Sequence, residues 1–150
     1  MNNVILLNDW PKPSSVPEPR VFADESKLIV RYFTFDDSVA IITFPQVIAF
    51  QFGSPNDERL DAHPLYKNGL DFYSVHKVDD SSWIRELAKR NGIYFEYDQK
   101  DYMKDKIHYI FTFHDSTLEC AVTDSNRCKS VIRVCKSDEA DWIWKHEINA

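Results

Sequence analysis

The sequence predicts an α+β fold in which antiparallel β-sheet predominates, arranged as a meander that is either curled or two-layered. One clear covering helix is expected at about residues 81–91, and a short helix at the C-terminus. Three observations lead to this prediction: short segments alternate apolar and polar residues, one segment repeats apolar residues at helical spacing, and 14% of the residues are aromatic. A chain of 150 residues falls in the one-domain size range, so we expect a single domain over residues 1–150.

The N-terminal part of the chain is rich in proline. Four of the seven prolines lie between residues 11 and 19, and proline is excluded from helix interiors and central strands. We therefore expect residues 8–20 to form an extended arm. The apolar residues 4–7 fit either an edge strand or a segment packed on the domain surface.

Three strands are predicted after this arm. Residues 27–33 alternate in polarity, and residues 39–44 and 47–52 are apolar on both faces, as in central strands that are covered on two sides. Pro45 separates the last two segments. It predicts a bend or a change of sheet between them.

Residues 81–91 carry the clearest helical pattern. Asp80 or Ser81 is a suitable N-cap, and Gly92 follows the end of the pattern. One face of the helix is apolar and is expected to cover the sheet. It is formed by Trp83, Ile84, Leu87 and Ala88.

Residues 107–122 carry the strongest β pattern and predict a hairpin. A turn at residues 115–116 pairs apolar residues on one face, namely Phe113 with Leu118, Phe111 with Cys120 and Tyr109 with Val122. On the other face Thr112 meets Glu119, and His114 lies diagonal to Glu119. A four-residue loop of the same parity is the alternative and leaves the facing unchanged.

The remaining segments are predicted from weaker patterns. Residues 93–97 fit a further strand, residues 98–106 one helical turn, and residues 128–134 a third strand that completes the meander. Residues 138–148, with Ser137 as N-cap, fit a C-terminal helix with acidic residues in its first turn. Alternation on a strand is the other reading of Trp142, Trp144 and His146.

Charge and cysteine content limit the possible partners and the compartment. Eighteen Lys and Arg against 24 Asp and Glu give a net charge of −6, which argues against binding to nucleic acid or an anionic membrane and suits a basic partner. Three cysteines without paired spacing indicate no disulfide framework, so we expect reduced thiols and a cytoplasmic location. The short apolar run at residues 4–7 does not resemble a signal peptide.

The first candidate site is the long irregular segment at residues 53–70. It supplies acidic, imidazole and phenol groups within a short stretch, and loops on a rigid sheet are common positions for sites. The alternative is structural, because Asn56 after Pro55 fits an N-cap that opens a short surface helix. The candidate binding residues here are Asp57, Glu58, Asp61, His63 and Tyr66.

The second candidate site is the hairpin tip, with His114, Asp115 and Glu119. Adjacent residues on a strand point to opposite faces, which excludes a Ser–His–Asp triad within this string. A pair formed by His114 and Glu119 is possible across the hairpin, as a general base or a ligand-binding pair. If this polar face looks toward the 53–70 loop, His63, Asp57 and Glu58 join the same cluster; the structural alternative is a solvated tip.

Cofactor motifs are absent from the sequence. The chain has no HExxH, no EF-hand loop and no glycine-rich phosphate loop, so we expect no metal and no cofactor. Aromatic residues interleaved with acids, as at residues 9–10 and 141–144, suit an interface with a basic partner protein. Burial in the core is the structural alternative.

Some strings of the sequence resemble small uncharacterised bacterial proteins, over about residues 50–123. These strings are Gly-Ser-Pro-Asn-Asp-Glu at 53–58, Ser-Trp-Ile at 82–84 and Tyr-Ile-Phe-Thr-Phe-His-Asp-Ser-Thr-Leu-Glu-Cys at 109–120. A small acidic, aromatic-rich chain with a helix before a β-meander also resembles, in general form, the immunity proteins of bacterial toxin systems. This resemblance implies no residue roles.

Three functional hypotheses follow. The first is a protein-binding module, an immunity-like inhibitor whose acidic surface binds a basic toxin domain and occludes its active site. Its contact residues are those of the two candidate sites. The second is a small hydrolase that uses the His114/Glu119 pair beside the 53–70 loop, with His63 nearby. The third is a structural or homodimerising domain that pairs through free edge strands.

Overall fold

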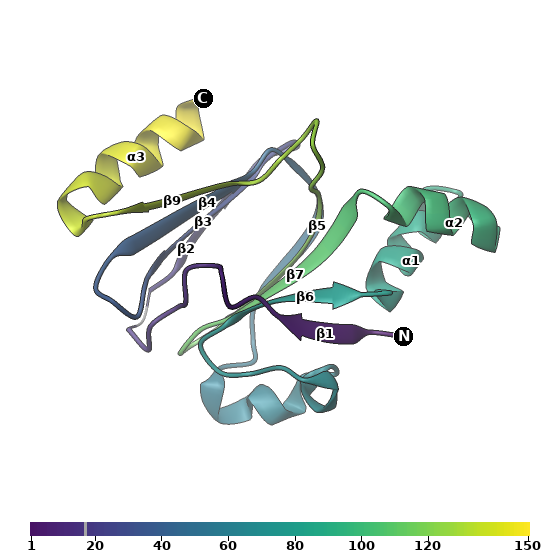
Figure 1. The fold of residues 1–150 in the computed structure, drawn as a ribbon, viewed down its shortest axis with the longest axis horizontal. Helices are drawn as coiled ribbons and strands as arrows, with labels where there is room; N and C mark the ends of the chain where they lie inside the picture. The colour runs from purple at the N-terminus through teal and green to yellow at the C-terminus, as the bar shows by residue number, and fades with distance from the viewer. Residues whose placement is uncertain (17) are drawn as a thin grey trace.

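The fold consists of two antiparallel sheets packed face to face, with helices on both outer faces (Figure 1). It is described by a computed structural model that covers residues 1–16 and 18–150. The five-stranded sheet has the order β1-β6-β7-β8-β5 and the four-stranded sheet the order β2-β3-β4-β9. This arrangement confirms the predicted α+β class and its two-layered form.

The bounds of the strands and helices are as follows. The larger sheet contains β1 (Asn3–Leu6), β6 (Val75–Asp79), β7 (Lys106–Thr112), β8 (Thr117–Thr123) and β5 (Gln46–Gly53). The smaller sheet contains β2 (Arg20–Ala23), β3 (Leu28–Phe33), β4 (Val39–Phe44) and β9 (Val131–Cys135). The α-helices are α1 (Ser82–Arg90), α2 (Glu96–Met103) and α3 (Ser137–Asn149), and the 3-10 helices are η1 (Asp57–Ala62) and η2 (Tyr66–Asn68).

The main core lies between the two sheets. Alternate residues of β3, β4, β7 and β8 point into it, because successive side chains of a strand face opposite sides of a sheet. The apolar face predicted for the 107–122 hairpin is confirmed. Its members are Tyr109, Phe111, Phe113, Leu118, Cys120 and Val122.

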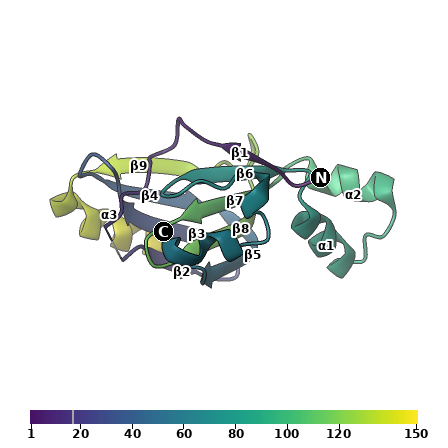
Figure 2. The ribbon, with the colours of Figure 1, turned by 90° about the horizontal axis from the view of Figure 1, so that it is seen from below.

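Helices cover both outer faces (Figures 1 and 2). Helix α3 packs on the smaller sheet through Ala140, Ile143 and Trp144, so the C-terminal segment is a helix, with Lys136 rather than Ser137 at the N-cap position. Helix α1 begins at Ser82, directly after Ser81, one of the two predicted N-caps, and packs on one end of the larger sheet. The predicted covering helix is therefore confirmed.

The change of sheet predicted at Pro45 is confirmed. Strand β4 ends at Phe44 in the smaller sheet, and β5 begins at Gln46 in the larger one. Strand β4 is buried along its whole length, as predicted for residues 39–44. Strand β5, however, is an edge strand beside β8 with exposed residues, so the prediction of a central strand at 47–52 is wrong.

The 107–122 hairpin has the four-residue loop that was the alternative prediction. Thr112 pairs with Thr117, and Phe113 N–H donates to Ser116 O. The register therefore differs by two residues from that of a two-residue turn, which preserves the facing of every side chain. Glu119 consequently pairs with Ile110 rather than Thr112, and His108 becomes its diagonal neighbour.

Two other local predictions are wrong. The third strand expected at residues 128–134 is present as β9, but it pairs with β4 in the smaller sheet and does not continue the meander, because β5 already occupies the edge of β8. Residues 93–97 form no strand: a loop leads into α2, and the Gln99 amide donates to the carbonyls of Ile93 and Tyr94. Two backbone acceptors of this segment are thus bound locally and take no part in a sheet.

The proline-rich arm and the N-terminal residues lie against the two sheets. Residues 3–6 form the edge strand β1 beside β6. The described residues of the 8–20 arm form an isolated bridge between Pro13 and Thr34, and the arm ends where β2 begins at Arg20. Pro17, part of the predicted arm, lies outside the described residues.

The described part of the chain contains no helix that is both long enough and apolar enough to cross a membrane.

The three cysteines form no disulfide bond with one another. Cys120 is buried in the core, and Cys128 and Cys135 are half-buried.

Candidate functional site

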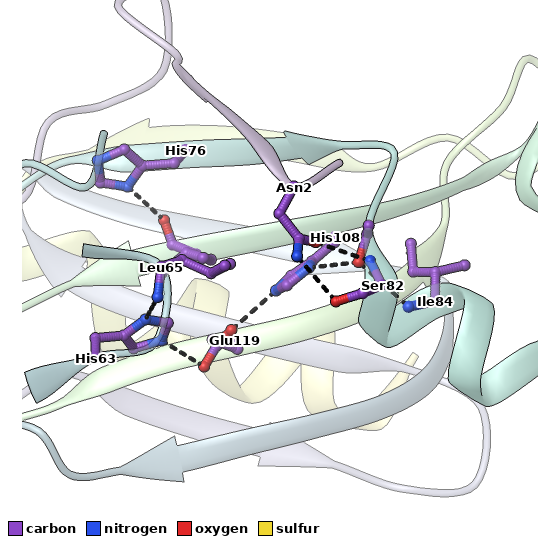
Figure 3. A network of polar contacts seen from close by, with 10 residues as sticks. Asn2, His63, Leu65, His76, Ser82, Ile84, His108 and Glu119 are labelled. Atoms are coloured by element: carbon purple, nitrogen blue, oxygen red, sulfur yellow. Dashed lines mark hydrogen bonds and ion pairs between the residues drawn. The ribbon is translucent and has the colours of Figure 1, made fainter. Parts of the chain in front are cut away.

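The candidate site lies on the outer face of the larger sheet, between the η1–η2 segment and helix α1 (Figure 3). Leu60 and Leu70 cover Ile110 on one side, and α1 covers Ala121 on the other. Glu119 lies on β8 between these two covered regions, on the same face as Ala121. The segments that cover the sheet thus leave a polar position between them.

Glu119 is held by two histidines. His63 Nε2 lies 2.8 Å from Oε2 of Glu119, and His108 Nε2 lies 2.9 Å from Oε1. The side chains of His63, His108 and Glu119 are 4%, 2% and 17% exposed. Each carboxylate oxygen therefore accepts a hydrogen bond in a largely dry environment, where such bonds are strongest.

The protonation of His63 follows from its second nitrogen. The backbone N–H of Leu65 donates to Nδ1 of His63 over 3.0 Å, and a nitrogen that accepts a hydrogen bond carries no proton. His63 is therefore a neutral imidazole with its proton on Nε2, where it donates to Glu119. The two bonds fix both the tautomer and the orientation of the ring.

Ser81 determines the state of His108 in a similar way. The Ser81 Oγ accepts from Ile84 N–H as the N-cap of α1 and lies 2.8 Å from His108 Nδ1. Among the described residues, His108 Nδ1 is the acceptor available to the buried Ser81 hydroxyl. The arrangement that satisfies every group has Ser81 donating to Nδ1 and a neutral His108 donating from Nε2 to Glu119.

Glu119 is consequently ionised. Burial raises the pKa of the Glu119 carboxyl group, but the hydrogen bonds that it accepts from His108 and His63 are the main opposing cause, and the net result is a pKa of about 2. A carboxylate with so low a pKa is a weak base at neutral pH. Since both nitrogens of both imidazoles are engaged, this cluster is poorly suited to general base catalysis.

The low pKa of Glu119 predicts a loss of stability in acid. The Glu119 carboxyl group loses its proton more readily in the folded than in the unfolded chain. Its contribution to the free energy of unfolding is therefore complete above about pH 4.5 and disappears as the pH falls toward about 2. A lowering of this size corresponds to about 3 kcal/mol. Urea denaturation at about pH 6 and about pH 3 should show roughly two thirds of this loss, because pH 3 is still about one unit above the pKa of Glu119 in the folded chain.

Glu119→Gln is the matched variant for that measurement. It retains the other carboxylates with lowered pKa values, such as Asp57 and Asp141, and should lose clearly less stability than the wild type over the same pH interval. An equal loss in both proteins would assign the acid sensitivity to other groups.

A pocket of about 180 Å³ opens above Glu119. The sheet forms its floor, His63 to Leu65 one wall, and the start of α1 with Trp83 the other. The Trp83 ring meets the His108 ring edge-on, with 4.9 Å between the centroids. Asn2 closes the rim, because its side chain bonds to both the N–H and the hydroxyl of Ser82 (Figure 3).

The predicted pair of His114 with Glu119 is not formed. In the four-residue loop, His114 lies beyond the paired strands, and its Nδ1 is 3.0 Å from Oδ2 of Asp57. Asp57 also accepts a hydrogen bond from the Tyr73 hydroxyl. This hydrogen bond and the charge of His114 both lower the pKa of Asp57. A hydrogen bond to its own backbone and the Asp57 charge raise the pKa of His114.

The 53–70 loop nevertheless reaches the hairpin, a proximity that the sequence left open. Its beginning contacts the tip through Asp57 and His114, and its end reaches Glu119 through His63. The predicted structural alternative is also correct, since Asn56 caps η1 by accepting from Arg59 N–H. Loop and hairpin thus form two separate clusters rather than one.

The remaining candidate residues have different positions. Glu58, Asp61 and Asp115 are exposed to solvent. Tyr66 is partly buried against the apolar cluster that contains Leu60. His108, Ser81 and Trp83 belong to the site but were not predicted as members. The alternation of the hairpin placed His108 on the same face as Glu119, but the two-residue turn assumed for the hairpin set a register in which the two side chains are not neighbours.

A different exposed feature lies at the free end of the α1–α2 pair, which extends beyond the sheets (Figure 2). Tyr94, Phe95 and Tyr97 are 71%, 77% and 84% exposed. Residue Gln99 is buried beneath them and holds the loop through its two bonds to backbone carbonyls, while Ile93 N–H donates to Ala88 O. We call Tyr94, Phe95 and Tyr97 the aromatic tip.

The aromatic residues near the chain termini differ from this tip. Trp10 packs against the core, where its ring lies 4.8 Å from that of Tyr109. Trp144 packs beneath α3, and Trp142 is 68% exposed and stacks on His146. The interleaving of exposed aromatic and acidic residues that suits an interface is therefore more pronounced at residues 94–98 than at 9–10 or 141–144.

Residues 1–16 and 18–150 contain no group of three or more His, Cys, Asp or Glu side chains placed to hold a metal ion. Comparisons of the chain with protein-family models, curated proteins and solved structures give no match. The resemblance to immunity proteins therefore stays a prediction.

Proposed function

We propose that this protein is a protein-binding module that contacts its partner through the aromatic tip. The observation that carries the proposal is the strong exposure of Tyr94, Phe95 and Tyr97, which lie close together in the sequence where the α1–α2 loop enters α2. Tyrosine and phenylalanine are enriched in the cores of protein interfaces, where their burial supplies much of the binding energy. Three neighbouring aromatic side chains left in water are an unfavourable arrangement unless a partner covers them.

The rigidity of the loop supports this proposal. The backbone carbonyls of Ile93 and Tyr94 accept from the buried Gln99 side chain, and Phe95 O accepts from Gln99 N–H at the start of α2. Helix α2 is itself joined to α1 through Tyr102 and Met103. A surface held in one conformation before binding loses less conformational entropy when the complex forms.

The charge around the tip favours a basic partner. Glu96 and Asp98 alternate with the aromatic residues and are exposed, and the whole chain carries a net charge of −6. Complementary charge increases the association rate and favours correct orientation. An immunity-like inhibitor of a basic toxin domain is the specific form of this proposal, with the tip rather than the 57–61 acids as the main contact.

The test begins with the full-length protein immobilised in a lysate of the source cells. The captured protein is identified, purified and titrated in solution, because capture alone does not show a specific contact. Phe95→Ser is expected to weaken the Kd about 30-fold, the effect of losing one hot-spot residue. The Kd should also rise with salt concentration.

Trp142→Ser is the matched control, since Trp142 is a comparably exposed aromatic residue on α3. It should change the Kd by less than about threefold. The proposal fails if Phe95→Ser leaves the Kd of the purified complex unchanged. It also fails if Phe95→Ser merely converts a dimer of this chain to a monomer in size-exclusion chromatography, because a second copy would then cover the tip.

A further inference from the structure

We infer that the pocket above Glu119 is a binding site for an organic cation, an alkylammonium or alkylguanidinium group. The pocket lies on the larger sheet between the η1–η2 segment and α1, away from the aromatic tip. The inference does not depend on the proposed function. It rests on the charge of the pocket, on its walls and on its size.

The pocket carries an uncompensated negative charge. Glu119 is an ionised carboxylate, and its two partners, His63 and His108, are neutral because their Nδ1 atoms accept from Leu65 N–H and from the Ser81 hydroxyl. None of the described residues that line the pocket is Lys or Arg. Two cations that lie next to lining residues in the sequence or on α1 have another partner: the N-terminal ammonium of Met1 and the guanidinium of Arg85 both pair with Asp80.

A partly buried anion that has hydrogen-bond donors but no counterion is unusual. Buried carboxylates are commonly paired with a cation, because hydrogen bonds alone only partly replace the water that burial removes. Glu119 keeps 17% of its side chain exposed, toward the pocket. A cation that enters the pocket would supply the missing charge, whereas an anionic ligand would be repelled.

The walls of the pocket suit a cation with an alkyl stem. Trp83 provides the aromatic ring type that binds cations best. Gln51 lies directly opposite Glu119 in the β5–β8 register and supplies an amide oxygen at the rim. Pro64 and Leu65 add apolar surface for a methylene chain.

The size of the pocket limits the ligand to a small group. A volume of about 180 Å³ corresponds to about six water molecules. Butylammonium or butylguanidinium fits this space approximately. The same chemical group can come from a free amine or from a Lys or Arg side chain of a partner protein, and the experiment below separates these sources.

The direct test is an NMR titration of the full-length protein with butylguanidinium and butylammonium chloride at neutral pH. We expect saturable shifts at the Trp83 indole and at the His63 and His108 rings, with a Kd of about 1 mM. 1-Pentanol, which has an apolar stem and no charge, and sodium chloride at equal ionic strength are the controls. Either control reproducing the saturable shifts would overturn the inference.

Gln51→Lys tests the site without altering a buried group, because Gln51 is exposed on an edge strand. The added ammonium should weaken butylguanidinium binding at least about tenfold, whereas Gln51→Glu should tighten it by a few-fold. Glu119→Gln should abolish the saturation, and Glu58→Gln, on the exposed surface of η1, should leave it unchanged. Equal binding by the two Gln51 variants would overturn the inference, as would the absence of saturation in the wild type.

The source of the cation is tested with a short acetylated and amidated peptide that contains a single Arg between glycines. Tighter binding of this peptide than of butylguanidinium supports a partner side chain, and weaker binding supports a free amine; both outcomes support the site. Phe95→Ser should bind butylguanidinium with the wild-type Kd. The proposal of a cation site in the pocket and the proposal of partner binding at the aromatic tip can therefore be disproved independently.

Discussion

Glu119→Gln is expected to lower the free energy of unfolding by about 3 kcal/mol at neutral pH. The amide keeps the volume of the carboxylate but offers one acceptor atom and one donor group to two histidines. His63 cannot change its tautomer, because Leu65 N–H occupies its Nδ1. If His108 changes its tautomer instead, the Ser81 hydroxyl loses its acceptor. Every arrangement therefore leaves a buried donor without a partner, and both charge-assisted bonds are lost.

Urea denaturation of the variant and the wild type at pH 7 measures this difference. Glu58→Gln removes an exposed carboxylate of η1 and should change stability by less than about 0.5 kcal/mol. A loss below about 1 kcal/mol for Glu119→Gln would show that the two histidines do not depend on the carboxylate as described.

Phe111→Ala should have a larger effect, a loss of about 4 kcal/mol. Phe111 is fully buried between the two sheets. Its ring contacts four other aromatic rings at centroid distances of 5.9–6.3 Å, those of Trp10, Tyr32, Phe44 and Phe113. These rings come from the N-terminal segment, the smaller sheet and the hairpin loop of the larger sheet, so the core has little freedom to collapse into the cavity.

The free energy of unfolding of Phe111→Ala is to be compared with that of Phe35→Ala. Phe35 is 73% exposed, and its removal should cost less than about 1 kcal/mol. Similar losses for the two variants would contradict the description of the inter-sheet core. A variant Phe111→Leu, which should lose clearly less than the alanine variant, extends the series if Phe111→Ala fails to fold.

The sheet face to which each side chain of the hairpin points was predictable, because it depends only on whether the residue occupies an odd or an even position along the strand. Residues 107–122 alternate so strongly that Phe111 and Cys120 had to share the apolar face, whichever loop closed the hairpin. The register was not predictable, since a shift of two residues leaves the facing unchanged. That shift replaces His114 by His108 as the neighbour of Glu119.

Contacts between distant segments were predictable only in part. The position of the 53–70 loop beside the hairpin was a hypothesis that depended on the sheet face, and the contact of His63 with Glu119 agrees with it. Ser81 was one of two predicted N-caps, but its second bond, to His108, joins residues that no local pattern connects. The aromatic tip was missed because the apolar alternation of residues 93–97 resembles a strand.

The description of Glu119 as one buried anion between two neutral imidazoles underlies its acid sensitivity, the cost of its substitution and the cation pocket. A long-range ¹H–¹⁵N correlation spectrum of the histidine rings at pH 7 tests it most directly. We predict a protonated Nε2 and an unprotonated Nδ1 for both His63 and His108. Protonation of both nitrogens in either ring would place a compensating positive charge beside Glu119 and contradict the account.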